Sequence, residues 1–258
     1  RIVGPDKGRR VIRSLLTGIA ALTALIIIWQ IAVMATGVPR FILPAPGLVF
    51  RAFTENSGLI AEHAMVTLTE VVLGLMIGIL LGISTALHLE ISPSARLFLR
   101  PILIFSQAIP VFALAPLLTL WLGYGMISKV TMAVLIIYFP VTSAFHDGLA
   151  NTPAGYLHLS SVMGASKLKV LFLIKVPAAM PSLLSGIRLS AVYAPIGATI
   201  GEWVGSSQGL GYLMLLANGR VKTDLMFAAL FTLGALSMSL YGLISLLIRR
   251  HFSRFQAN

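Results

Sequence analysis

Residues Val66 to Leu87, VTLTEVVLGLMIGILLGISTAL, form an apolar stretch of 22 residues whose only charged side chain is Glu70. A helix of about 20 apolar residues crosses the roughly 30 Å hydrocarbon core of a bilayer. Apolar and polar side chains do not alternate along the stretch, which disfavours a strand of a membrane β-barrel. The stretch is therefore predicted to be a transmembrane helix.

The composition of the whole chain agrees with this prediction. Of its 258 residues, 57% are hydrophobic and 10% are charged, and the mean hydropathy is +0.94. Soluble domains carry about 25% charged residues, so a water-soluble globule and a disordered chain are both excluded. The net charge of +11 comes from short basic clusters between apolar runs, a pattern typical of membrane topology rather than of nucleic-acid binding. Cysteine is absent, which excludes disulfides and thiolate metal sites.

Five more stretches have a similar length and composition. They are Ser14–Ala35, Pro101–Leu122, Lys129–Phe145, Leu183–Val204 and Leu225–Ile248. The first of them is 22 residues long, which exceeds the apolar region of a signal peptide and predicts a retained anchor helix. The expected fold class is an all-α membrane protein with six transmembrane helices.

Basic residues are distributed unevenly between the two sides that six spans create. Thirteen Lys and Arg lie in the N-terminal arm, in the linkers after the second and fourth spans and in the C-terminal tail, against five on the other side. Cytoplasmic loops carry the excess of Lys and Arg, so both termini are predicted to be cytoplasmic. Residues 1–13 are expected to form a basic cytoplasmic arm, and residues 14–258 one transmembrane domain.

The longest cytoplasmic linker, about residues 147–182, is predicted to contain two short helices. Thr152 and Pro153 suit an N-cap and a first helical position, which predicts a helix over Pro153–Met163 ended by Gly164. Ser166 can cap a second helix that carries Lys167 and Lys169. On physical grounds this linker suits two roles equally, docking onto a partner protein or lying on anionic lipid as an amphipathic helix. Pro177 and Pro181 are expected to interrupt the approach to the fifth span.

The spacing within this linker resembles a known signature. Gly164 is followed by nine residues, Ile174, one residue and then Val176-Pro177. The cytoplasmic signature of ABC importer permeases is Glu-Ala-Ala, three residues, Gly, nine residues, Ile, one residue, Leu-Pro. In this chain His158-Leu159-Ser160 stands in place of the opening triad, and Val176 replaces Leu.

Other segments resemble the nitrate, sulfonate, taurine and thiamine-precursor branch of the same family, from about residue 40 to the end of the chain. These segments are Leu43–Pro46, Ile109–Leu117, Trp121–Gly123, Gly201–Gly205 and Gly209–Gly211.

This resemblance implies the fold of a type I ABC importer permease in the bacterial cytoplasmic (inner) membrane. The linker would form coupling helices that dock onto an ATPase subunit, which favours a partner protein over lipid alone. The residues that the resemblance assigns to this contact are His158, Leu159, Ser160, Gly164, Ala165, Ser166, Ile174 and Pro177. It also implies two copies of the permease, two ATPase subunits that bind ATP and Mg²⁺, and an extracytoplasmic solute-binding protein.

The chain contains no motif for bond-making chemistry. It has no phosphate-binding Gly-x-x-x-x-Gly-Lys-Ser/Thr loop, no Gly-x-Ser-x-Gly and no His-Glu-x-x-His, and its five His lack metal-ligand spacing. We therefore expect a transport subunit that is not an enzyme, holds no cofactor or metal and binds no nucleic acid.

Within the spans, small and proline residues predict packing and bends. Gly74, Gly78 and Gly82 form one stripe on a helix, which permits close approach of another helix. Pro110 and Pro116 interrupt the third span, and each is expected to kink it. Pro140 is expected to do the same in the fourth span.

Polar residues in the spans suggest which helices face a pathway. Ser106 and Gln107 lie beside the prolines of the third span, and Glu202 is a carboxylate in the fifth. The candidates for lining the pathway are Ser106, Gln107, Pro110, Pro116 and Glu202. Glu202 and Glu70 lie near the predicted outer ends of their spans, where a half-hydrated position suits them, and Arg188 lies near an inner end.

These observations predict the pore subunit of an ATP-driven importer. The alternative is a self-sufficient secondary carrier or channel, which would require internal repeats and deep ionisable residues. The solute stays open between nitrate, a sulfonate, taurine and a pyrimidine-type thiamine precursor, with a slight preference for the last.

Overall fold

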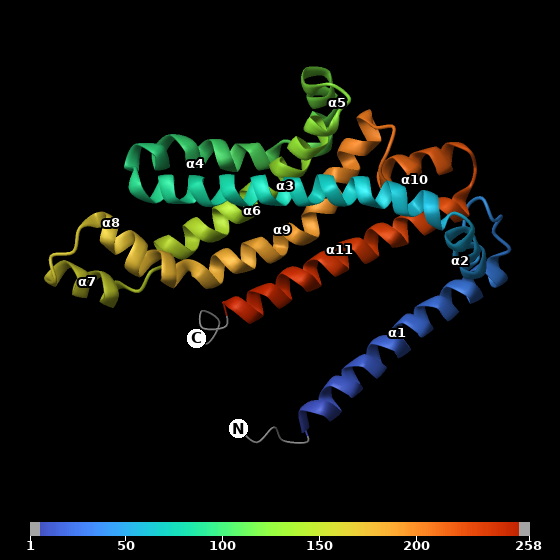
Figure 1. Ribbon diagram of the computed structural model, residues 1–258, viewed down its shortest axis with the longest axis horizontal. Helices are drawn as coiled ribbons and strands as arrows, with labels where there is room; N and C mark the ends of the chain where they lie inside the picture. The colour runs from blue at the N-terminus through green and yellow to red at the C-terminus, as the bar shows by residue number, and fades with distance from the viewer. Residues whose placement is uncertain (1–5, 253–258) are drawn as a thin grey trace.

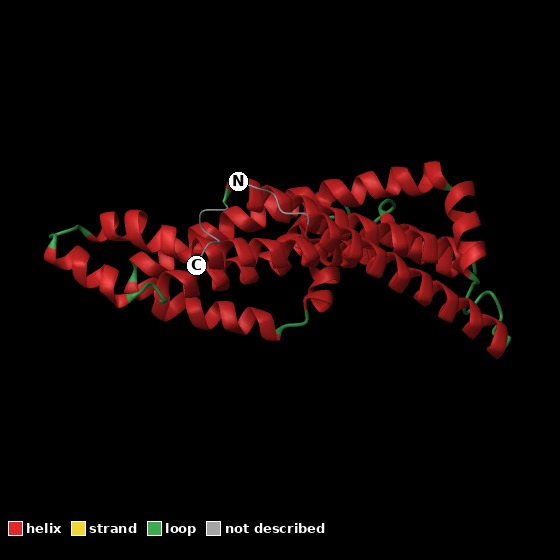
Figure 2. Cartoon of the chain, turned by 90° about the horizontal axis from the view of Figure 1, so that it is seen from below, coloured by secondary structure: helices red, strands yellow, loops and turns green. Residues whose placement is uncertain are grey.

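The computed structural model describes residues 6–252, in which all regular structure is helical (Figure 2). The helices are α1 Asp6–Thr36, α2 Pro46–Glu55, α3 Ser57–Ile91, α4 Pro93–Ala108, α5 Val111–Leu122, α6 Met126–Ala150, α7 Ala154–Val162, α8 Lys167–Val170, the π-helix η1 Leu171–Lys175, α9 Val176–Gly205, α10 Leu210–Gly219 and α11 Thr223–His251. Five helical segments in this part of the chain are long and apolar enough to span a membrane, and the bent pair α4–α5 makes a sixth if it is counted as one span.

The centre of the bundle is formed by α3, α6 and α9, which lie side by side (Figure 1). Its buried core includes Val71 and Leu75 from α3, Ile137 and Val141 from α6, and Ala194 from α9. Burial of these side chains alone does not hold helices together in lipid, so close backbone approach supplies the packing energy.

The glycine stripe of α3 faces α6. A Cβ atom at Gly74 would lie 2.6 Å from the Cβ of Ala133, and one at Gly78 would lie 2.9 Å from Ile137. A Cβ at Gly82 would lie 2.7 Å from a methyl group of Val141. The absence of side chains at these positions therefore sets the distance between α3 and α6.

We expect Gly82→Val to lower the free energy of unfolding by about 1–3 kcal/mol, the usual cost of overpacking a close interface. Thermal unfolding in detergent, followed by intrinsic fluorescence, measures this change. Gly234→Ala in α11 is the matched control, because a Cβ there meets nothing within 4 Å. Equal melting temperatures for the two variants would show that the stripe does not determine the packing.

The end of the bundle formed by α2 and α10 has a second core, which also includes parts of α3 and α11. Most of helix α1 stands apart from the bundle, and none of the residues in its spanning segment is fully buried (Figure 1). Trp29 of α1 stacks on Phe227 of α11 with ring centroids 5.8 Å apart. The predicted arm 1–13 overlaps α1, which begins at Asp6, and residues 1–5 lie outside the described part.

The third predicted span is two helices rather than one kinked helix. The axes of α4 and α5 meet at 101° across Ile109 and Pro110. Both residues have extended backbone, because the ring of Pro110 disfavours helical geometry at Ile109 and Pro110 has no N–H to donate. Pro116, by contrast, lies inside α5 without ending it.

The expected interruption at Pro177 and Pro181 is absent from the described helices, whereas the kink expected at Pro140 stays a prediction. Pro140 lies within the continuous helix α6. Pro177 and Pro181 lie within α9, which continues α8 and η1 without interruption from Lys167 to Gly205. The π-turn η1 ends just before Pro177, and such wide turns relieve the clash that a proline ring makes with the preceding turn. The predicted second short helix is therefore the first turn of a 39-residue helix.

Candidate functional site

The first candidate site is the α7–α8 corner, residues 154–170, which forms one end of the molecule (Figure 1). Gly164 has φ +65°, a left-handed conformation that glycine adopts without strain. Its N–H donates to Ser161 O (3.1 Å), and the Ala165 N–H donates to Ser160 O (3.0 Å). These two hydrogen bonds form a Schellman motif, which ends α7 and turns the chain into α8.

The residues that the resemblance assigns to ATPase contact differ in exposure. His158 and Leu159 are exposed on α7, whereas Ser160 is buried beneath the corner. Ser166 is exposed at the start of α8, where its side chain makes no capping hydrogen bond. The remaining assigned residues are Gly164, which is exposed, and Ala165, Ile174 and Pro177, which are half-buried.

Several large apolar side chains of the α7–α8 corner are exposed. Val162 is 85% exposed and Met163 is 76% exposed, and Leu159 and Leu168 are also exposed. Contiguous exposed apolar side chains beside lysines mark a surface that binds another molecule.

The prediction that Thr152 caps α7 is wrong. Pro153 is the N-cap, and the Thr152 hydroxyl donates to Leu149 O (2.9 Å).

The second candidate site lies between α4 and α6. A cavity of about 220 Å³ is lined by Ser106 and Gln107 of α4 and by Tyr138 of α6, and it extends past the break at Ile109. Pro110 and Pro116 are both exposed and do not line it. The structure thus brings two of the predicted pathway residues to one cavity and leaves the two prolines outside it.

A neighbouring cavity of about 160 Å³ lies nearer the α3–α4 connection and shares Leu103 with the first. Its lining includes Arg100, Phe139, His146 and Asp147. The Nδ1 atom of His146 is buried and has no hydrogen-bond partner among the side chains and backbone that the structure describes. No spacing pattern in the sequence connects these residues, because α4 and α6 are separate spans.

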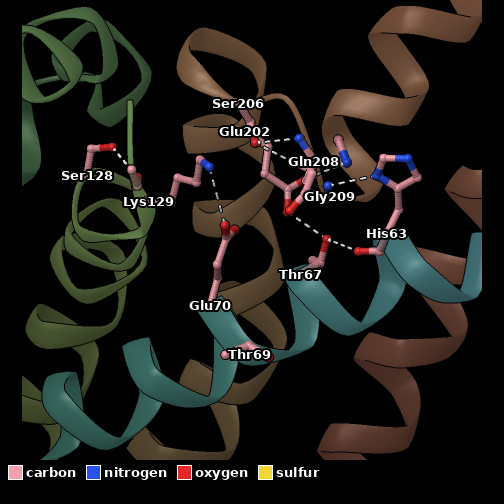
Figure 3. Close-up of polar contacts among 12 residues, drawn as sticks. His63, Thr67, Thr69, Glu70, Ser128, Lys129, Glu202, Ser206, Gln208 and Gly209 are labelled. Carbon is pink, nitrogen blue, oxygen red and sulfur yellow. Dashed lines mark hydrogen bonds and ion pairs between the residues drawn. The ribbon is translucent and has the colours of Figure 1, made fainter. Parts of the chain in front are cut away.

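The third candidate is a buried polar cluster near α10 (Figure 3). Glu202 of α9 is 1% exposed, so the prediction that it is half-hydrated is wrong. Its Oε1 accepts a hydrogen bond from the Thr67 hydroxyl (2.6 Å), and its Oε2 accepts one from the Gly211 N–H (2.5 Å). In this structure Glu202 therefore binds the first turn of α10, and its expected role in lining the pathway stays a prediction.

Helix α3 contributes two more groups to this cluster. Thr67 Oγ1 accepts a hydrogen bond from the Leu210 N–H (2.8 Å), and His63 Nδ1 accepts one from the Gly209 N–H (3.0 Å). The N–H groups of a first helical turn have no partner within their own helix. Here Glu202, Thr67 and His63 supply those partners, so side chains from α3 and α9 hold α10 in place.

Beside this cluster lies a buried ion pair. Lys129 Nζ of α6 is 3.7 Å from Glu70 Oε1 of α3, and both side chains are less than 10% exposed. Glu70 was expected to be half-hydrated, but it is fully buried. The Arg188 Nε atom is also buried, without a hydrogen-bond partner among the described residues. Among the side chains of residues 16–252, no group of three His, Asp or Glu could hold a metal ion.

Comparison with known proteins identifies a family and several relatives. The model of the family described as "Binding-protein-dependent transport system inner membrane component" matches residues 74–257. A probable ABC transporter permease protein of Haemophilus influenzae is 50% identical over 226 residues, which cover 88% of this chain and 92% of that protein.

Two further relatives are named for the solute they carry. The riboflavin transport system permease protein RibX of Chloroflexus aurantiacus is 38% identical, over 88% of this chain and 86% of the relative. The formylaminopyrimidine transport permease protein ThiX of Halalkalibacterium halodurans is 37% identical, over 83% and 86% of the two chains. A chain of the MetNI methionine ABC transporter has the same fold, with a TM-score of 0.66 at 18% identity over 76% of this chain and 97% of that one.

Proposed function

This chain belongs to the family of binding-protein-dependent transport system inner membrane components, and we propose that it couples ATP hydrolysis on a partner subunit to the import of a small polar solute. As a multi-pass membrane permease of that family, it is a transport subunit and leaves hydrolysis to a separate ATPase. The α7–α8 corner is the observation that carries the proposal, because its exposed apolar side chains form a rigid surface at one end of the bundle.

The continuous helix from Lys167 to Gly205 supports a mechanism for coupling. Its first turn is α8, the second helix of the α7–α8 corner, and the same helix packs in the core against α3 and α6. A movement that the ATPase imposes on the corner therefore reaches the middle of the bundle without crossing a flexible linker. Rigid-body displacement of such an element converts a bundle between two discrete packings, which here are outward-open and inward-open states.

The partners follow from this mechanism. Two ATPase subunits engage the α7–α8 corners of two copies of this chain, and ATP and Mg²⁺ bind to the ATPases. A solute-binding protein delivers the solute on the opposite side of the membrane. The family description and the fold shared with an ABC transporter subunit support this assembly.

For the solute we propose a nitrogen heteroaromatic compound, of which a substituted pyrimidine is the simplest case. Two relatives more than one-third identical are named for formylaminopyrimidine and riboflavin, which are both heteroaromatic. The cavities between α4 and α6 support this class, since Phe139 and Tyr138 offer aromatic faces. Arg100 and Asp147 offer a hydrogen-bond donor and an acceptor beside them.

Purification of the tagged chain in mild detergent, followed by mass spectrometry, tests the assembly. We expect a P-loop ATPase at one-to-one stoichiometry, and ATP-dependent uptake of labelled formylaminopyrimidine when the complex and its binding protein are placed in liposomes. Taurine is the control solute. A chain that purifies alone and transports without ATP would instead support a secondary carrier, and uptake of taurine but not of the pyrimidine would overturn the solute class.

A further inference from the structure

One carboxylate joins three helical elements near the α7–α8 corner. Glu90, in the last turn of α3, lies between two cations. Its Oε1 is 2.6 Å from Lys175 Nζ, and its Oε2 is 3.3 Å from Arg96 Nη2. The Glu90 side chain is only 10% exposed, and that of Lys175 is 20% exposed. The Glu90–Lys175 pair, which is largely shielded from water, is screened less by salt than an exposed pair. The Arg96 side chain is 46% exposed, so its pair with Glu90 is the more hydrated of the two.

The two cations come from elements with different roles. Lys175 is the last residue of the π-turn η1, at the point where the helix that begins at the corner continues into α9. Arg96 lies in the first turn of α4, and its Nε also donates to Leu89 O (3.3 Å) at the end of α3. Single π-turns occur frequently at functional sites, because they alter the register of one helical turn against its neighbours.

Helix α4 is held by few other contacts. None of its residues, Pro93 to Ala108, all of which the structure describes, is buried. Its other end is the break at Ile109 and Pro110. Side chains of α4 nevertheless line both cavities between α4 and α6. A force applied at Arg96 therefore meets little resistance from packing and moves the wall of these cavities.

We propose that Glu90 is a positioning residue that transmits movement of the α7–α8 corner to α4. When the corner shifts, Lys175 shifts with it, and the shared carboxylate draws Arg96 and the start of α4 along. The continuous helix α9 moves the core, whereas the Lys175–Glu90–Arg96 contact moves the wall of the cavities. This inference rests on the proposed coupling to an ATPase.

Labelling of one cysteine on α4 tests this inference without knowledge of the solute. Because the chain has no cysteine, Ser106→Cys introduces a unique and nearly isosteric reporter in the cavity wall. The complex purified with its ATPase is treated with a fluorescent maleimide, with and without ATP and vanadate, and the labelling rate of this subunit is measured on a gel. With Glu90 intact, we expect the nucleotide to change the rate several-fold.

The substitutions Glu90→Gln and Lys175→Gln are then added to the reporter chain. Each is expected to reduce the nucleotide-dependent change in labelling strongly and to the same residual level, while assembly with the ATPase and its basal hydrolysis stay as before. Lys175→Gln leaves Glu90 paired with Arg96, so it preserves the fold if Glu90→Gln does not. Combining the two should produce no further loss, since both break the same contact. Glu55→Gln is the matched control, because its pair with Arg51 lies in α2 and is largely exposed.

The labelling results distinguish a role for Glu90 in moving α4 from a purely structural role. If the labelling rate of Ser106→Cys does not change with nucleotide when Glu90 is intact, the role of Glu90 is overturned. The same follows if the rate still changes as strongly with nucleotide in the Lys175→Gln variant. Losses that add in the double variant would also overturn it, because the two side chains would then act separately. A chain that purifies without an ATPase would contradict the proposed function itself, and the wild-type preparation reveals that before any variant is made.

Discussion

Replacing Gly209 by alanine should lower the free energy of unfolding by about 2–5 kcal/mol and release α10 from the bundle. Gly209 has φ +105°, a conformation that side chains with a Cβ rarely adopt. A Cβ there would also overlap the carboxyl group of Glu202. The variant would therefore displace the group that accepts the Gly211 N–H, and would weaken the contacts of Thr67 and His63 with α10.

Two measurements check this prediction. Thermal unfolding in detergent reports the loss of stability, and hydrogen exchange reports whether the amides of Leu210 and Gly211 lose protection. Gly219→Ala, at the other end of α10, is the control, because a Cβ there meets nothing within 4 Å. If Gly209→Ala and Gly219→Ala had the same melting temperature and the same exchange rates, the buried cluster would not be what holds α10.

Replacing Gly164 by proline should leave membrane insertion intact and reduce ATP-driven uptake at least about tenfold, which corresponds to about 1.4 kcal/mol. Proline fixes φ near −65°, whereas Gly164 has φ +65°. Proline also removes the N–H that donates to Ser161 O. The Schellman motif cannot form without both features, so α7 and α8 would lose the angle that presents their apolar side chains to the ATPase.

Uptake into liposomes and ATP hydrolysis by the purified complex are measured together, so that uncoupling is distinguished from loss of assembly. Gly164→Asn is the conservative control, because asparagine tolerates left-handed geometry better than most residues. Gly155→Ala controls for a change on α7 that affects no turn. A Gly164→Pro chain that transports normally, or a Gly164→Asn chain as defective as the proline variant, would refute the assigned role of the turn.

The structure gives the physical reason for this prediction. A glycine can be required either because there is no room for a side chain or because of its backbone conformation. In the structure a Cβ at Gly164 meets nothing within 4 Å, so within this chain the sign of φ is the constraint and not the available space. The sequence pattern located the turn correctly, but it could not distinguish these two causes.

Prolines show a similar limit of sequence reasoning. Pro110 ends a helix, whereas Pro116, Pro140 and Pro177 lie inside continuous helices. The sequence marks each as a place where one backbone hydrogen bond is missing. Whether the helix breaks there depends on how neighbouring turns and helices compensate, as the π-turn η1 does before Pro177.

Fold class, the approximate spans and the membership of the permease family were predictable, because hydropathy, charge and motif spacing are properties of short segments of the chain. The predicted orientation rests on the same kind of signal and stays a prediction. Tertiary structure alone decided that Glu202 and Glu70 are buried, that α10 is held by His63 and Thr67, and that Glu90 joins Lys175 to Arg96. These contacts connect helices that are distant in the sequence, such as Thr67 and Glu202, which are 135 residues apart. A buried charge is tolerated only where the packing of several helices brings it a partner, and no local pattern records that packing.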